Sequence, residues 1–151
     1  MKVRQAIIGA AGNGERLGLG TKSLMIYKGR IILDYLVEEC VKAGIDNIVI
    51  SALSNEELSK VESQKAILFK SLIAKYPQIK LKQEGTTSYG RIPDRVRHLV
   101  NTSQPFYFFC GQSPHPASHL RKMSKHHSGG SLVVSGYKYR YDVIIPVAKV
   151  S

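Results

Sequence analysis

Short apolar runs alternate along the chain with longer segments in which apolar residues recur every three or four positions. The short runs are rich in Ile, Val and Phe, which is typical of buried strands. We predict strands at residues 3–8, 47–52, 79–83, 106–110, 131–137 and 143–147. The run at 106–110 is apolar throughout, which predicts a strand in the interior of a sheet.

The longer segments predict helices. Apolar residues spaced for one helical face predict a helix over 31–42. Ser54 and Glu57 form a capping-box pattern for a second helix over 54–76, which Pro77 ends. Two further helices are predicted at 92–100 and 116–126.

The alternation of strands and helices predicts an α/β fold. We expect a three-layer α/β/α sandwich with a mostly parallel, Rossmann-like central sheet. The chain has 151 residues and no segment that looks like a linker, so we expect a single domain over 1–151. No apolar run approaches the roughly 18 residues that span a membrane, so we expect a cytoplasmic protein without a membrane partner. Cys40 and Cys110 fall in predicted buried elements, which favours core packing over a disulfide.

The charge balance points to an anionic partner. Lys and Arg number 22 against 11 Asp and Glu, a net charge of +11. A nucleoside triphosphate and a phosphorylated small molecule would suit such a chain, and so would nucleic acid. The tyrosines among basic residues at 137–141 could stack on single-stranded bases, or they could form one face of a strand.

The most informative segment follows the first predicted strand. It is glycine-rich over 9–18, carries Arg16 and leads to Lys22. Glycines let backbone N–H groups approach phosphate oxygens, Arg16 can make forked phosphate contacts, and Lys22 offers a point charge. A P-loop would need glycine directly before Lys22, and a threonine stands between them. A dinucleotide loop would need an acid after the second strand, where the chain has Ser51-Ala52.

The segment from Ala6 to about Ser51 resembles the N-terminal half of the nucleotidyltransferases with the nucleotide-diphospho-sugar transferase fold. The family motifs are Ala-Ala-Gly, then x-Gly-x-Arg-Leu, then Lys-x-Leu after a gap. The matching residues here are Ala10-Ala11-Gly12, Gly14, Arg16-Leu17 and Lys22, followed by Gly29, the helix at 31–42 and Ala43-Gly44-Ile45-Asp46-Asn47-Ile48-Val49-Ile50. The short gap before Lys22 looks more like the molybdopterin and cobinamide nucleotidyltransferases, and Gly9 stands where the family usually has leucine.

The resemblance implies transfer of a nucleoside monophosphate from an NTP to a phosphorylated acceptor, with release of pyrophosphate. Arg16 would neutralise the pyrophosphate and Lys22 would lie over the α-phosphate, so these are the predicted catalytic residues. The family often reads the base with a glutamine and a Gly-Thr pair, which here are Gln83 and Gly85-Thr86. The predicted nucleotide-binding residues are Ala10, Ala11, Gly12, Asn13, Gly14, Glu15, Gln83, Gly85, Thr86 and Gly111.

The end of the 106–110 strand departs from the family pattern. The family usually reads Gly-Asp-x-Pro there, and the Asp binds Mg²⁺. This chain reads Gly-Gln-Ser-Pro at 111–114, so Gln112 replaces the carboxylate that hard divalent ions prefer. The expected cofactor is Mg²⁺, with Gln112 and Asp142 as its candidate ligands.

Two histidines follow this position. His115 and His119 have the i, i+4 spacing of metal ligands on a helix. No glutamate accompanies them in the metalloprotease arrangement, so we interpret both as polar surface residues at a helix edge. The alternative is that His115, so close to Gln112, contacts a phosphate or a metal.

Three functions remain open on the sequence. The first is an Mg²⁺-dependent nucleotidyltransferase that acts on a sugar phosphate, cobinamide phosphate, molybdopterin or polyol phosphate. The second is a non-catalytic nucleotide-binding or regulatory relative, marked by Gln112. The third is an RNA-binding module that uses the net charge. The chain is shorter than is usual for the family, so a homo-oligomer could complete the acceptor pocket.

Overall fold

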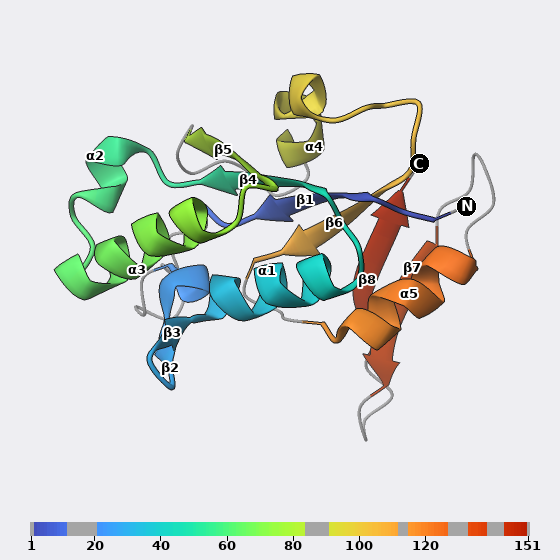
Figure 1. Cartoon of the computed structure of the whole chain (residues 1–151), viewed down its shortest axis with the longest axis horizontal. Coiled ribbons are helices and arrows are strands. Elements are labelled where there is room, and N and C mark those ends of the chain that lie inside the picture. Colours follow the sequence, from blue (N-terminus) through green and yellow to red (C-terminus); the bar gives the residue numbers. More distant parts are fainter. Residues whose placement is uncertain are drawn as a thin grey trace.

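Six strands form one mostly parallel sheet, in the order β5-β4-β1-β6-β8-β7 (Figure 1). The computed structural model describes residues 2–11, 21–83, 91–111, 115–126, 133–138 and 144–150, the last two ranges as backbone. The strands are β1 Gln5–Gly9, β4 Asn47–Ala52, β5 Ile79–Gln83, β6 Phe106–Cys110, β7 Val133–Lys138 and β8 Ile144–Val150. Strands β5, β4, β1 and β6 are parallel, and β8 is antiparallel to β6 and β7. The predicted strands and the interior position of β6 are confirmed.

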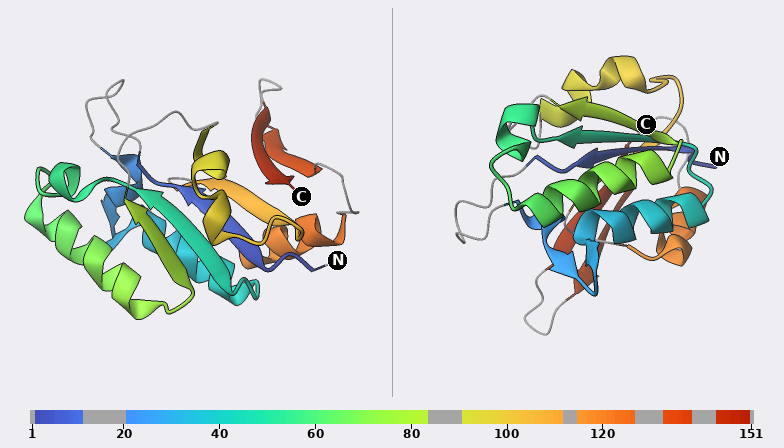
Figure 2. Two further views of the ribbon diagram at one scale, coloured as in Figure 1. Left: turned by 90° about the horizontal axis from the view of Figure 1, so that it is seen from above. Right: turned by 60° about the vertical axis from the view of Figure 1, so that its left-hand side comes forward.

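Helices cover both faces of this sheet (Figure 2). The helices are α1 Ile32–Lys42, α2 Asn55–Leu58, α3 Ser63–Lys75, α4 Ile92–Arg95 and α5 Ala117–Lys125, with 3-10 helices η1 Lys22–Leu24 and η3 Arg97–Leu99. Helices α1, α3 and α5 pack on one face, and α4 packs on the other. The three-layer α/β/α architecture is therefore confirmed. Among the described residues, none of the helices has the length and apolar character needed to cross a bilayer.

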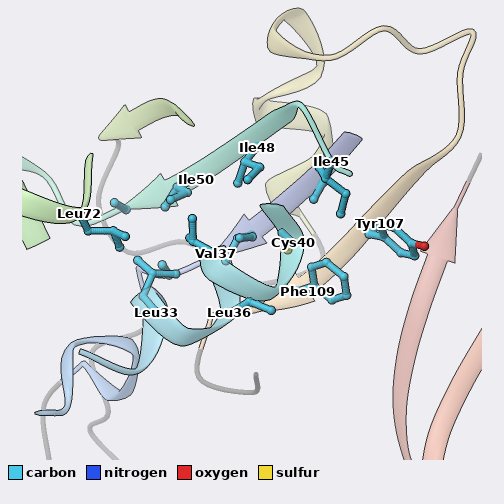
Figure 3. Packing of buried hydrophobic residues seen from close by; sticks show 14 of the residues in the cluster. Leu33, Leu36, Val37, Cys40, Ile45, Ile48, Ile50, Leu72, Tyr107 and Phe109 are labelled. Carbon is cyan, nitrogen blue, oxygen red and sulfur yellow. The ribbon is translucent and has the colours of Figure 1, made fainter. Parts of the chain in front are cut away.

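The larger core lies between α1 and the sheet (Figure 3). Leu33, Leu36, Val37 and Cys40 of α1 are each 0% exposed. Burying an aliphatic side chain of this size contributes about 1.5–3 kcal/mol, so this helix anchors the layer. Burial raises the pKa of the Cys40 thiol to about 12, which keeps it protonated. Cys40 is the core residue that we predicted, whereas Cys110 is half-buried; both are free thiols.

The opposite face of the sheet has a smaller core. Ile7 of β1 and Val49 of β4 pack there against Ile92 and Val96 of the α4 region. Successive residues of a strand point to opposite faces, so β1 serves the larger core with Ile8. Because both faces are covered, the inner strands β1, β4 and β6 are mostly apolar, whereas the edge strand β5 alternates apolar and polar residues.

The single helix that we predicted after Ser54 is wrong, because the structure has α2 and α3 instead. The capping box is present: the Glu57 N–H donates to Ser54 Oγ at 3.1 Å. The Ser59 hydroxyl donates to the Glu56 carbonyl at 2.6 Å, a local bond that competes with helix continuation. Glu62 then takes a non-helical conformation (φ −53°, ψ 135°), and α3 begins after it.

The helix predicted over 92–100 is also divided, into α4 and η3. Val96, which lies between them, has φ −106° and ψ 9°, outside the helical region. The Leu99 carbonyl accepts hydrogen bonds from Asn47 Nδ2 at 3.1 Å and Lys80 Nζ at 3.3 Å. These contacts hold the end of η3 against β4 and β5.

A two-stranded hairpin, β2 Ile26–Tyr27 and β3 Arg30–Ile31, precedes α1. Lys28 and Gly29 both have positive φ, 50° and 78°, as a type I′ turn requires. We predicted only a glycine turn here, because strands of two residues are too short to show periodicity. Arg30 fixes the hairpin to α1 through a forked bond to Asp34, at 2.8 and 3.2 Å.

A polar network closes the amino end of the sheet. Gln5 is only 6% exposed. Its Nε2 donates to the Asn101 carbonyl at 2.9 Å, and its Oε1 accepts from the Asn101 N–H at 2.7 Å. Asn47 Nδ2 donates to the same oxygen at 3.2 Å. These bonds fasten the connection between η3 and β6 to β1 and β4.

Candidate functional site

The carboxyl ends of the four parallel strands meet at one edge of the sheet. The register pairs Gly9 with Ser51 and Cys110, and Ala52 with Gln83. In an open α/β sheet, ligands bind outside this edge. The structure thus brings together those predicted site residues that it describes, namely Ala10, Ala11, Lys22, Gln83 and Gly111.

The segment after β1 is fixed before the glycine-rich loop begins. Ala10 and Ala11 are 5% and 3% exposed. The Ala10 N–H donates to the Ser51 carbonyl at 2.8 Å, so this amide holds the start of the loop against β4. The rest of the predicted loop, including Gly12, Asn13, Gly14, Glu15 and Arg16, lies outside the described residues.

Lys22 is held at the same edge by η1, whose first residue it is. The Ser23 hydroxyl donates to the Ala10 carbonyl at 3.1 Å. Thr21 and Leu24, on either side, are 8% and 3% exposed, so the short helix is anchored in the protein. Lys22 itself is half-buried and therefore keeps a solvent-facing part. Sequence reasoning did not identify Ser23 as the residue that fixes this position, although it follows the family lysine directly.

Gly111 lies against the end of β1. Its N–H donates to the Gly9 carbonyl at 2.8 Å. A Cβ on Gly111 would lie 3.0 Å from the Gly9 carbonyl oxygen and 3.1 Å from the Ala10 Cβ. Those distances are shorter than ordinary van der Waals contact, so the close approach of the two chain segments requires glycine here.

Gln83, the predicted base reader, contacts the connection between β4 and α2. Its Nε2 donates to Asn55 Oδ1 at 2.9 Å and to the Leu53 carbonyl at 3.3 Å. The amide nitrogen is therefore engaged with protein atoms, which orients the amide group. Asn55 was not identified from the sequence; its place directly after the capping Ser54 was the only signal. Gly85 and Thr86 lie outside the described residues.

The candidate metal ligands Gln112 and Asp142 lie outside the described residues as well. In the part of the chain that is described, no three His, Cys, Asp or Glu side chains are grouped to hold a metal ion. Of the two acidic residues that first follow β4, Glu56 pairs with Lys60 at 3.7 Å and Glu57 is used in the α2 capping box. The residues described at this edge thus do not fit a carboxylate-bound Mg²⁺ centre.

The interpretation of His115 as a surface residue is wrong. It is 3% exposed, and its ring lies 5.8 Å from that of Phe109 and 5.9 Å from that of His119. Burial, and then the neighbouring His119, lower the pKa of His115 below its ordinary value, so the ring is neutral at pH 7. The β6–α5 connection folds back under α1, where the Ala117 N–H donates to Glu39 Oε2 at 2.8 Å. Periodicity within α5 could not reveal this packing.

Several solved structures share the fold. A 4-diphosphocytidyl-2C-methyl-D-erythritol synthase from Anaerococcus prevotii superposes with a TM-score of 0.70 and 17% identity, over 99% of this chain and 71% of that one. An inositol-1-phosphate CTP transferase from T. maritima has a TM-score of 0.68 and 17% identity, over 93% of this chain and 56% of that one. A Mycobacterium tuberculosis protein in complex with manganese has a TM-score of 0.62 and 13% identity, over 100% and 71%.

The similarity lies in the fold and not in the overall sequence. No protein-family model and no curated protein matches the sequence. The resemblance to nucleotidyltransferases is confirmed at the level of the fold, while the narrower likeness to molybdopterin and cobinamide enzymes stays a prediction. The chain therefore has the nucleotide-diphospho-sugar transferase fold, with Lys22 at the edge where open α/β sheets bind ligands.

Proposed function

We propose that the chain is a nucleotidyltransferase, which binds an NTP at the carboxyl ends of β1 and β6. It would transfer the nucleoside monophosphate to a phosphorylated small molecule. The bond from Ser23 to the Ala10 carbonyl, at 3.1 Å, carries this proposal. It fixes Lys22 next to the start of the glycine-rich loop, in a fold whose solved examples include CTP transferases.

The proposed step is an in-line displacement at the α-phosphorus. An oxygen of the acceptor phosphate forms a bond to that phosphorus, while the bond to the oxygen bridging the β-phosphate breaks. Pyrophosphate leaves with the electron pair. Such transfer depends on positioning and on neutralising negative charge, and Lys22 and Arg16 are the cations proposed for that role.

A divalent metal, expected to be Mg²⁺, belongs to the proposal as a second source of positive charge. A related fold holds manganese in the Mycobacterium tuberculosis protein. Gln112 offers an amide oxygen without charge, and Asp142 would be the lone carboxylate of the set. We therefore assign a larger share of the charge neutralisation to Lys22 and Arg16 than a site with two carboxylates would require.

The geometry of the edge supports two of the proposed nucleotide contacts, Gln83 and Gly111. The Gln83 Nε2 is engaged with Asn55, so its Oε1 is the atom that could accept a hydrogen bond from a base. Because Gly111 has no Cβ, the segment after β6 lies directly against the end of β1, beside Ala10. The remaining proposed contacts are Ala10, Ala11, Gly12, Asn13, Gly14, Glu15, Gly85 and Thr86. We also propose that residues 1–151 act as one domain in the cytoplasm, with oligomerisation as a way to complete the acceptor pocket.

A second candidate function rests on Gln112. If the neutral Gln112 side chain does not bind a divalent metal ion, the chain would bind an NTP without turnover, as a regulatory protein. Restoring the family acid with Gln112→Asp distinguishes the two functions. A binding protein would gain metal dependence of NTP binding, while an enzyme would also change its rate.

The test of the enzyme is pyrophosphate release from ATP, GTP, CTP and UTP with a panel of phosphorylated sugars and polyols. We expect release with one NTP, and Lys22→Ala should lower the rate about 100-fold because a preorganised charge is lost. Lys70→Ala is the matched control, since Lys70 is an exposed lysine on α3. Unchanged activity in Lys22→Ala would overturn the proposed mechanism.

A further inference from the structure

A pocket lies at the amino end of the sheet, opposite the candidate nucleotide site. Its volume is about 320 Å³, within the range of small-molecule sites. Val3, Ala43 and Tyr107 form an apolar floor, and all three are buried. Figure 1 places the N-terminal segment beside α5, and Figure 3 shows the Tyr107 hydroxyl directed away from the α1 core.

The pocket is held by bonds between segments that are distant in sequence. The Val3 N–H donates to the buried Ser124 Oγ at 2.9 Å, which ties the chain before β1 to α5. The Tyr107 hydroxyl donates to the Leu120 carbonyl. Arg121 Nη2 donates to the Lys42 carbonyl at the end of α1, at 2.7 Å. The floor is thus a fixed part of the fold, since each wall is bonded to another.

Three cations surround this apolar floor: Lys2, Arg121 and Lys125. Among the described residues, none of those that line the pocket is acidic. The nearby acids already have cationic partners, because Asp46 pairs with Arg4 at 2.5 Å and Glu39 with Lys42 at 3.5 Å. Three cations in the lining of one apolar pocket give it a positive potential, which favours a bound dianion.

We propose that this pocket binds a small phosphate monoester with a compact apolar body. The phosphate dianion would lie among Lys2, Arg121 and Lys125, and the apolar body would cover Val3, Ala43 and Tyr107. A carboxylate would supply only one charge against three cations. The site is separate from the proposed nucleotide site, since β1 runs from the amino-end pocket to Gly9 at the other edge.

Phenyl phosphate is the probe. Inorganic phosphate, which lacks the ring, and phenol, which lacks the phosphate, are the comparison ligands. We expect saturable binding of phenyl phosphate by calorimetry, with amide shifts at Val3, Ala43 and Ser124 in NMR spectra. Each half alone should bind more weakly, because the cations and the floor both contribute. Equal affinity for inorganic phosphate would overturn the assignment of the floor, and absence of saturable binding would overturn the site.

Charge variants complete the test. Lys2→Gln combined with Lys125→Gln should weaken phenyl phosphate binding about tenfold, since two cations are lost. Lys122→Gln is the matched control: Lys122 is exposed on α5 and does not line the pocket. Equal weakening by Lys122→Gln would mean general attraction to a basic surface and contradict the proposal. Amide shifts at Ala10 and Lys22 that disappear in Lys22→Ala would also contradict the proposal, because they would place phenyl phosphate in the nucleotide site.

Discussion

The two ends of the central sheet bind anions, on our account, in different ways. At the carboxyl end, the chain after β1 supplies a loop and a lysine within a few residues of each other, and Ser23 ties η1 to the Ala10 carbonyl. At the amino end, Lys2 and Lys125 come from opposite parts of the sequence and meet beside an apolar floor. The first kind of site leaves a motif, and the second leaves none.

Helix α5 connects the two regions. Its N-terminal side follows the buried His115, next to the carboxyl end of β6. Its last turn carries Lys125 to the amino-end pocket. If a substitution at one end left ligand binding at the other end unchanged, the two sites would be separate. If it altered ligand binding at both ends, α5 would link the two sites.

The largest expected effect comes from Gly111→Val. A Cβ at this position would already lie 3.0 Å from the Gly9 carbonyl oxygen, and valine adds two methyl groups. We expect the free energy of unfolding to fall by about 2–3 kcal/mol, as for other overpacked sites. Chemical denaturation measures this loss, and NTP binding should weaken at the same time.

Phenyl phosphate binding provides the control for Gly111→Val. It should persist under conditions in which the variant remains folded, since Val3 and Ser124 lie at the other end of the sheet. A variant as stable as the parent protein would contradict the close approach of β1 and the segment after β6.

A smaller effect is expected from acidification. The pKa of His115 is lowered in the folded chain, so the unfolded chain binds more protons as pH falls below about 6.5. Stability contributed by the neutral ring is present above that pH and is lost as pH falls toward the folded-state pKa. Thermal unfolding between pH 7 and pH 5 should show this decline, and His115→Gln should flatten it.

His126→Gln is the matched control for the acid effect, because His126 is exposed after α5. It should leave the pH dependence of unfolding unchanged. The same decline in His115→Gln and in the parent protein would show that another group causes it.

Local patterns predicted the parts of this fold that local forces decide. The strand at Phe106–Cys110 is an uninterrupted apolar run, and the capping box at Ser54 is present. Tertiary contacts decided the rest. The helix expected over 92–100 is divided at Val96, and beyond this break the Leu99 carbonyl bonds to Asn47 and Lys80, two residues that no local pattern links to it.

The same limit applies to the two sites. The family motif indicated Lys22, because the loop and the lysine are close in sequence. It could not indicate that Ser23 fixes η1, or that His115 is buried against Phe109. The amino-end pocket was not predicted from the sequence. Its floor combines Val3 with Tyr107 and its cations include Lys2 and Lys125, and both pairs are far apart in the sequence.

The most direct test of a nucleotide site at the carboxyl end of the sheet is a calorimetric titration. The parent protein and Lys22→Ala would each be titrated with ATP, GTP, CTP and UTP, with and without Mg²⁺. We predict that one NTP binds, and that Lys22→Ala weakens this binding about tenfold, as expected for loss of a charge-assisted phosphate contact. Binding of no NTP, or binding that is unchanged in Lys22→Ala, would contradict a nucleotide site at the carboxyl end of the sheet.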